Sequence, residues 1–106
     1  MLKRTSYCGE LRGADEGREV VLAGWVHKTR DMGGLVFVDL RDREGLAQVV
    51  FQSDRPELVE AAKKLRNEYV VGVRGLVRRR SSVNKDIPTG EIEVEARELV
   101  VFATSK

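Results

Sequence analysis

Phe37, Gln48 and Glu93 are the side chains in this sequence whose chemical types best fit the binding of unpaired RNA bases. An aromatic ring offers any base a stacking surface worth about 1–3 kcal/mol. Amide and carboxylate groups can hydrogen-bond to the exposed edges of bases, and arginines hold phosphates or stack on bases. These residues would form an RNA-binding face if the fold places them together on one surface.

A basic segment could add contacts with phosphates. Residues 70–85 contain no acidic residue and five basic ones: Arg74, Arg78, Arg79, Arg80 and Lys85. The net charge of the whole chain is only +2, so the argument for nucleic acid rests on this local distribution and not on the total charge. A solvated loop is the alternative explanation of the same charges.

Patterns typical of catalysis or of metal binding are missing from the sequence. We find no glycine-rich phosphate loop followed by Lys-Ser/Thr, no indication of a Ser-His-Asp set, and no cluster of metal ligands. The single cysteine, Cys8, excludes an intramolecular disulfide and a cysteine metal cluster. We therefore predict that residues 1–106 hold no catalytic residue, no metal and no cofactor, and that Cys8 is a small buried hydrophobic residue.

The length and composition of the chain fit a single globular domain. It has 106 residues, of which 42% are apolar, and these values suit one modest core. No run of about 18 apolar residues is present, and the N-terminus has no apolar signal-peptide region. With one cysteine and no such segments, the chain is expected to be cytoplasmic and to make no contact with a membrane.

The fold class follows from the order of the predicted elements. Five segments have the composition or the alternation of β-strands, namely residues 19–30, 35–41, 46–51, 69–79 and 91–102. Gly24, inside the first of them, predicts a bulge or a sharp bend. A five-stranded OB-fold, which is a Greek-key barrel with one helix between strands three and four, has this element order. Another small barrel is the alternative.

The helix is predicted from a change of period after the third strand. Leu58, Ala62, Leu65 and Tyr69 recur on one face of a helix, which predicts a helix over residues 55–68. Two signals mark its start. Asp54 followed three residues later by Glu57 resembles a capping box, and Pro56 suits a first helical turn.

Strand parity separates the core from the outer face of the predicted barrel. The aliphatic face of the second strand should be core, so Phe37 lies among polar neighbours on the outer face. By the same rule Gln48 and Glu93 point outward. Two alternatives remain: reversed faces would bury Phe37, and Gln48 and Glu93 could be ordinary residues of solvated strands. The positions predicted to face the core on strands two and three are Val36, Val38, Leu40, Ala47, Val49 and Phe51.

The segment GWVHKTRDMGGLVFVDLRDREGLAQVVF, residues 24–51, closely resembles bacterial aspartyl-tRNA synthetases. The segments YCGELR, LRNEYVVGVRGLVRRR and TGEIEVEARELVV resemble the same family, so the resemblance covers nearly the whole chain. Lysyl- and asparaginyl-tRNA synthetases share the fold, but the run RDMGGLVFVDLRDREG is of the aspartyl type.

This resemblance implies an OB-fold domain, residues 1–106, that grips the anticodon loop of tRNA-Asp. It implies that Phe37 stacks on an anticodon base. The other residues that it assigns to RNA binding are Arg30, Gln48, Arg78, Arg80, Asn84 and Glu93. The chain departs from the family at Lys28-Thr29-Arg30, where three arginines are common, at Val50, where some members have an aromatic residue, and in a short loop over 81–88.

The resemblance also implies a longer parent protein. In the family a class II catalytic domain follows, and the parent is a homodimer that charges tRNA-Asp with aspartate using ATP and Mg²⁺. The chain would then be one piece of that ligase, and His27 and residues 81–88 are positions where charging of tRNA-Asn could be decided. Two competing hypotheses are a free-standing OB-fold protein that binds single-stranded nucleic acid without ligase activity, and a protein-interaction barrel.

Overall fold

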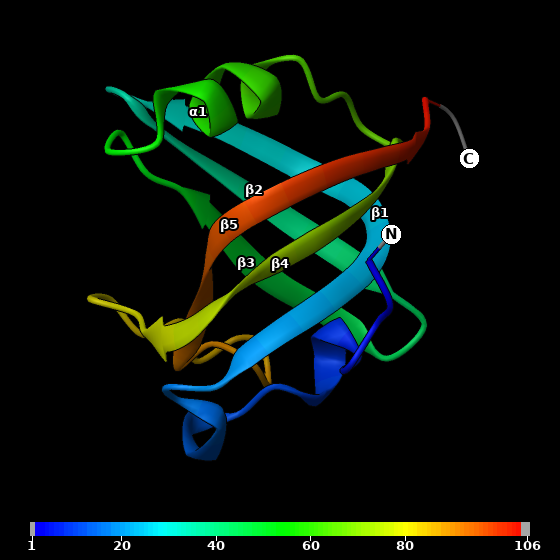
Figure 1. Ribbon diagram of the computed structural model, residues 1–106. Helices are drawn as coiled ribbons and strands as arrows, with labels where there is room; N and C mark the ends of the chain where they lie inside the picture. The colour runs from blue at the N-terminus through cyan, green and yellow to red at the C-terminus, as the bar shows by residue number, and fades with distance from the viewer. Residues whose placement is uncertain (1, 105–106) are drawn as a thin grey trace.

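Five β-strands close into a barrel in the order β1–β2–β3–β5–β4 (Figure 1). The computed structural model describes residues 2–104. The strands are β1 (Glu19–Met32), β2 (Leu35–Asp42), β3 (Gly45–Phe51), β4 (Val70–Arg79) and β5 (Ile92–Ala103). The helix α1 (Pro56–Lys63) lies between β3 and β4, and two short 3₁₀ turns, η1 (Cys8–Glu10) and η2 (Gly13–Asp15), precede β1. This is the predicted OB-fold order, and every strand pair is antiparallel except β3 with β5.

The long strand β1 belongs to both sides of the barrel. Its first half pairs with β4 and its second half with β2, and Trp25 pairs with both strands. Gly24 is buried at this crossing, and a side chain there would collide with the backbone carbonyl of Arg41. The predicted irregularity in this strand exists, but it lies between Val26 and Lys28 and not at Gly24. Gly24 instead permits the close approach of β2.

The bulge in β1 decides which way Arg30 points. Val26 pairs with a core residue of β2, whereas Lys28 and Arg30 pair with Asp39 and Phe37 on the outer face. Since side chains alternate along a strand, one extra residue exchanges the two faces. His27 is that extra residue. If His27 took a regular strand position and β1 had no bulge, Arg30 would share the inward parity of Val26.

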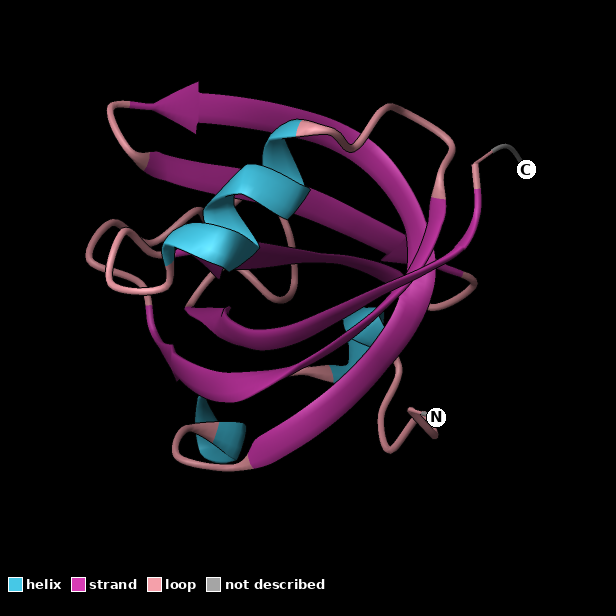
Figure 2. Ribbon diagram, turned by 45° about the horizontal axis from the view of Figure 1, so that its top comes forward, coloured by secondary structure: helices cyan, strands magenta, loops and turns pink. Residues whose placement is uncertain are grey.

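The core of the barrel consists of the residues predicted from parity. The six core residues predicted on β2 and β3 have exposed fractions of 0–2%. Ile92, Val94 and Ala96 continue the same layer on β5. Helix α1 lies across one end of the barrel (Figure 2) and adds Val59 and Ala62 to the core. The predicted assignment of faces is therefore confirmed.

Helix α1 is shorter than predicted. It ends at Lys63 instead of residue 68. The chain then turns through Glu68, which has a positive φ of 73°. The amide of Glu68 donates to the carbonyl of Val26, and the amide of Val26 donates to the carbonyl of Tyr69. Leu65 and Tyr69 contact the core, but from this turn. Pairing with β1 therefore ends the helix although the helical period continues in the sequence.

The predicted capping box is wrong. The N-cap residue is Arg55, which makes no side-chain cap hydrogen bond, so Asp54 and Glu57 do not take the two capping positions. Pro56 does occupy the first turn, as predicted. Its fixed φ and missing N–H suit that position without any capping side chain.

The N-terminal segment closes the other end of the barrel. Cys8 and Leu11 are buried in the core, and the amide of Cys8 donates to Oδ2 of Asp42 over 2.6 Å. Burial, followed by the negative charge of Asp42, raises the pKa of the Cys8 thiol far above its usual range. Cys8 is thus the small buried residue that the sequence predicts. Among residues 2–104, no helix is long and apolar enough to cross a membrane.

Candidate nucleic-acid interface

Phe37 lies on the outer face of the barrel, where strand parity places it. Its register partner on β1 is Arg30 and its partner on β3 is Val50. The ring is half-buried, and the guanidinium carbon of Arg30 lies 5.8 Å from its centroid. Strands β1, β2 and β3 thus present an aromatic ring on the outer face, with a guanidinium beside it.

Four polar side chains form a hydrogen-bonded chain beside this ring. Nη2 of Arg30 donates to Oε1 of Gln48 over 3.0 Å. Nε2 of Gln48 donates to Oε1 of Glu93 over 2.9 Å. The other carboxylate oxygen of Glu93 accepts from Nε of Arg78 over 2.7 Å. We call Arg30, Gln48, Glu93 and Arg78 the polar chain.

The polar chain fixes the direction of each group before any ligand arrives. The Gln48 amide has its oxygen toward Arg30 and its nitrogen toward Glu93. Each of these groups still has unused hydrogen-bonding capacity, because an amide and a carboxylate can make more bonds than those formed here. Gln48 and Glu93 lie on the outer face as predicted, but they are only 5% and 8% exposed. Their partners cover them, so the prediction of simple outward-pointing residues was incomplete.

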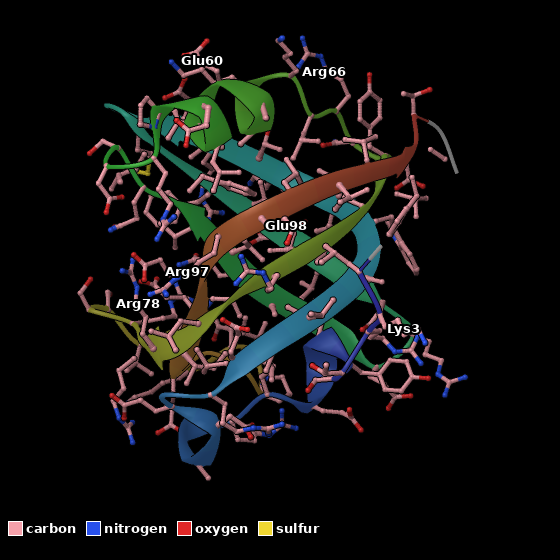
Figure 3. All side chains as sticks on the ribbon, in the orientation of Figure 1. Lys3, Glu60, Arg66, Arg78, Arg97 and Glu98 are labelled. Carbon is pink, nitrogen blue, oxygen red and sulfur yellow. The ribbon has the colours of Figure 1, made fainter. Side chains whose placement is uncertain are left out.

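Arg78 is held by more than Glu93. It donates to Oε1 of Gln52 over 3.2 Å and lies 3.8 Å from a carboxylate oxygen of Glu95. Glu95 also pairs with Arg97 at 3.4 Å, and the two arginines lie on the same side of the barrel (Figure 3). Arg78 therefore joins β4 to β5 and to Gln52, the residue after β3, and supports the polar chain.

The loop between β4 and β5 forms a wall beside these strands. Asn84 has its side-chain oxygen bound by the amide of Asp86 over 2.9 Å, and its own amide donates to the carbonyl of Gly90 over 3.0 Å. Gly90 has to be glycine, since a side chain there would collide with the carbonyl of Asn84. The loop therefore has a defined shape, and its residues Arg80 and Asn84 line the same hollow as Phe37.

The ring, the polar chain and the loop enclose one pocket of about 570 Å³. This volume lies in the usual range for ligand sites. Six of the seven predicted site residues line it, and the seventh, Arg78, borders it through its bond to Glu93. The lining residues are Arg30, Met32, Phe37, Asp39, Leu46, Gln48, Arg80, Ser81, Ser82, Asn84, Ile87 and Glu93.

Asp39 and Leu46 line the pocket although they are not among the predicted site residues. Asp39 pairs with Arg30 at 3.5 Å, and Leu46 forms part of the wall from the start of β3. Asp39 has the parity of Phe37, and Leu46 has the parity of Gln48. Strand parity alone could therefore have identified both.

A second hollow of about 560 Å³ lies beside α1. Size does not distinguish the two, but composition does. The second hollow has no aromatic ring and no chain of linked polar groups among its lining residues. These are Thr29, Asp31, Val36, Ala62, Lys63, Leu65, Arg66 and Asn67. The pocket beside Phe37 is thus the candidate site for RNA bases.

The basic segment 70–85 does not form a positive stripe. Acidic side chains of neighbouring strands and loops neutralise three of its arginines: Arg74 pairs with Glu19 and Glu98, Arg78 with Glu93 and Glu95, and Arg79 with Glu16 and Glu91. Alternation along β4 also sends neighbouring side chains to different faces. Within residues 2–104, Arg80 and Lys85 are the members of the segment that form no ion pair, and Arg80 is the one that lines the pocket.

Comparison with known proteins identifies the kind of domain that carries this pocket. Residues 20–102 match the tRNA anti-codon family, described as an OB-fold nucleic acid binding domain. The chain belongs to this family. It is 60% identical over 107 residues to an aspartate–tRNA(Asp/Asn) ligase of Anaeromyxobacter dehalogenans, and the match covers 99% of this chain and 18% of the ligase. The resemblance to aspartyl-tRNA synthetases is therefore confirmed.

Solved structures of similar domains occur both within synthetases and as separate chains. The asparaginyl-tRNA synthetase of Pyrococcus horikoshii, complexed with asparaginyl-adenylate, is 34% identical with a TM-score of 0.81, over 99% of this chain and 24% of that one. An OBody bound to hen egg-white lysozyme is 28% identical with a TM-score of 0.87, and the match covers 98% of it. A chain of this size can therefore form the barrel by itself.

Proposed function

We propose that this chain binds the anticodon loop of tRNA-Asp as the recognition module of an aspartate–tRNA ligase. The observation that carries the proposal is the pocket in which Phe37, the polar chain and the loop residues Arg80 and Asn84 meet. Membership of the anticodon-binding family and the 60% identity to a ligase of this kind support it.

The pocket suits unpaired bases because it combines a stacking surface with polar groups that are already oriented. An anticodon base would stack on Phe37. The free N–H of the Gln48 amide would donate to base edges, and the free lone pairs of Gln48 and Glu93 would accept from them. Arg30 and Arg80 would contact phosphates from the two sides. Because the polar chain exists before binding, little additional side-chain entropy would be lost when RNA enters.

The reaction of the parent protein belongs to residues outside this chain. The chain spans about a fifth of the length of the ligase that it matches. In this proposal the whole protein is a homodimer that charges tRNA-Asp with aspartate at the expense of ATP, with Mg²⁺. Residues 1–106 supply only the choice of tRNA.

Binding of RNA stem-loops to the purified chain tests the proposal. A stem-loop with the tRNA-Asp anticodon should bind more tightly than stem-loops of the same stem in which each anticodon base is changed in turn. Fluorescence anisotropy at one fixed salt concentration would give the affinities, because salt alone changes them strongly. Equal affinity for all loops would favour the unspecific single-strand binder, and no binding to any of them would favour the protein-interaction barrel.

A further inference from the structure

The two halves of the pocket meet at a weakly paired seam of the barrel. Arg30, Phe37 and Gln48 come from β1, β2 and β3, whereas Glu93 and the loop come from the β4–β5 side. Across this seam the described residues of β3 and β5 pair at only two positions, 49 with 94 and 50 with 95. The position of the loop relative to Phe37 therefore depends on contacts other than the strand ladder.

Thr89 supplies one such contact. Its side chain is 2% exposed, and Oγ1 donates to the backbone carbonyl of Leu46 over 2.7 Å. Leu46 lies at the start of β3, three residues before the first pair of the β3–β5 ladder, and its side chain lines the pocket. The hydroxyl thus joins the end of the loop to β3 at a point where the two strands are not paired.

The rest of the loop is tied closely to Thr89. Its neighbour Gly90 accepts from the amide of Asn84 over 3.0 Å and donates to the carbonyl of Ile87 over 3.1 Å. Asn84 and Ile87 both line the pocket. A shift of Thr89 would therefore move these two residues together, relative to Phe37 and Gln48.

We propose that Thr89 is a positioning residue for RNA recognition: its hydroxyl holds the β4–β5 loop against β3 at the width that the RNA loop requires. The inference rests on the proposed function of the pocket. Thr89 does not contact RNA itself, since it is buried behind the loop. It acts through Asn84, which Gly90 holds, and through Arg80, whose amide donates to the carbonyl of Glu91 over 3.0 Å. Arg80 and Asn84 both line the pocket that the RNA would enter.

The test compares Thr89→Val, which replaces the hydroxyl by a methyl group, with Thr89→Ser, which keeps it. The probe is the tRNA-Asp anticodon stem-loop. Loss of this internal hydrogen bond should weaken RNA binding by Thr89→Val roughly 3- to 10-fold. Thr89→Ser keeps the bond, so its RNA affinity should lie within about twofold of that of the unchanged chain. Thr5→Val is the matched control, because its hydroxyl also bonds strand backbone, at Val21, and does not line the pocket.

A double-mutant cycle separates positioning from general destabilisation. If Thr89 acts through the loop, Thr89→Val and Arg80→Ala should be less than additive in RNA affinity, while Thr89→Val and Phe37→Ala should add. Unchanged affinity in a folded Thr89→Val chain, or additivity with Arg80→Ala, would overturn the inference. If Thr89→Val does not fold, a loss in Thr89→Ser as large as that in Arg80→Ala would overturn it as well. Failure of the unchanged chain to bind the stem-loop would instead reject the proposed function.

Discussion

At the scale of single residues, the environment of Phe37 could be predicted from alternation and from residue type. Aliphatic neighbours at 36 and 38 fix the core face, so the ring has to lie on the other side, and the structure places it there. The sequence could predict which residues form the polar chain, but it could not predict the hydrogen bonds that join them. Which oxygen of Glu93 accepts from which partner depends on distances across three strands, and no local pattern in the sequence contains these.

Phe37→Ala should weaken binding of the tRNA-Asp anticodon stem-loop by about 1–3 kcal/mol, because a stacking surface is lost. Its urea midpoint should change little, since the ring lies outside the core. Phe51→Ala is the matched control: this ring is 0% exposed, and its loss should cost about 3–5 kcal/mol of unfolding free energy. Both quantities would be measured on each variant. A large midpoint drop in Phe37→Ala, or full RNA affinity, would contradict the stacking role.

Arg80→Ala should reduce the dependence of RNA affinity on salt. Within residues 2–104 Arg80 forms no ion pair and lines the pocket, so its charge is available for a phosphate. Removing one phosphate contact should lower the slope of log affinity against log salt by up to about one unit. Arg79→Ala is the control, since Arg79 pairs with Glu16 and Glu91 outside the pocket. Equal slopes for both variants would mean that Arg80 is only solvated.

At the scale of elements, the strands could be predicted more accurately than the helix. Each strand boundary lies within two residues of its prediction, because alternation and turn glycines mark both ends. The helix was predicted five residues too long at its C-terminal end, because the bonds between β1 and residues 68–69 overrule the local period. The bulge at His27 had no unambiguous signal, since nothing in the residue itself requires it.

Deletion of His27 tests the role of this bulge. Removing this extra residue would restore continuous alternation with Lys28 and Arg30 still facing outward, but it would also remove the local bend and the stronger twist of β1. The deletion should therefore lower the unfolding free energy by roughly 0.5–3 kcal/mol, the usual range for a single change, without turning Arg30 toward the core. His27→Ala should be nearly neutral, since His27 is exposed. Urea unfolding followed by circular dichroism would compare them. A deletion variant as stable as His27→Ala would show that β1 does not need the bulge.

At the scale of the whole molecule, the barrel assembles the pocket from residues that are as many as 63 positions apart in the sequence, from Arg30 to Glu93. The resemblance to a known family predicted this assembly, and composition did not. The basic segment 70–85 illustrates the difference: its charges allowed a phosphate-binding stripe as well as a solvated surface, and folding places acidic partners beside three of its arginines. Charge is a property of the folded surface, so local counts miss such neutralisation.

The proposed division of labour between this domain and a separate catalytic domain leads to the last prediction. The pocket combines an aromatic ring and hydrogen-bonding side chains with the apolar residues Met32, Leu46 and Ile87. The sequence contains no glycine-rich phosphate loop followed by Lys-Ser/Thr that could hold the triphosphate of ATP. Purified residues 1–106 should therefore bind the anticodon stem-loop and yet catalyse no aspartate-dependent exchange of pyrophosphate into ATP. The exchange assay would include Mg²⁺ and aspartate, with a full-length aspartate–tRNA ligase as the positive control. Exchange above the level without aspartate would show that amino-acid activation extends into this barrel.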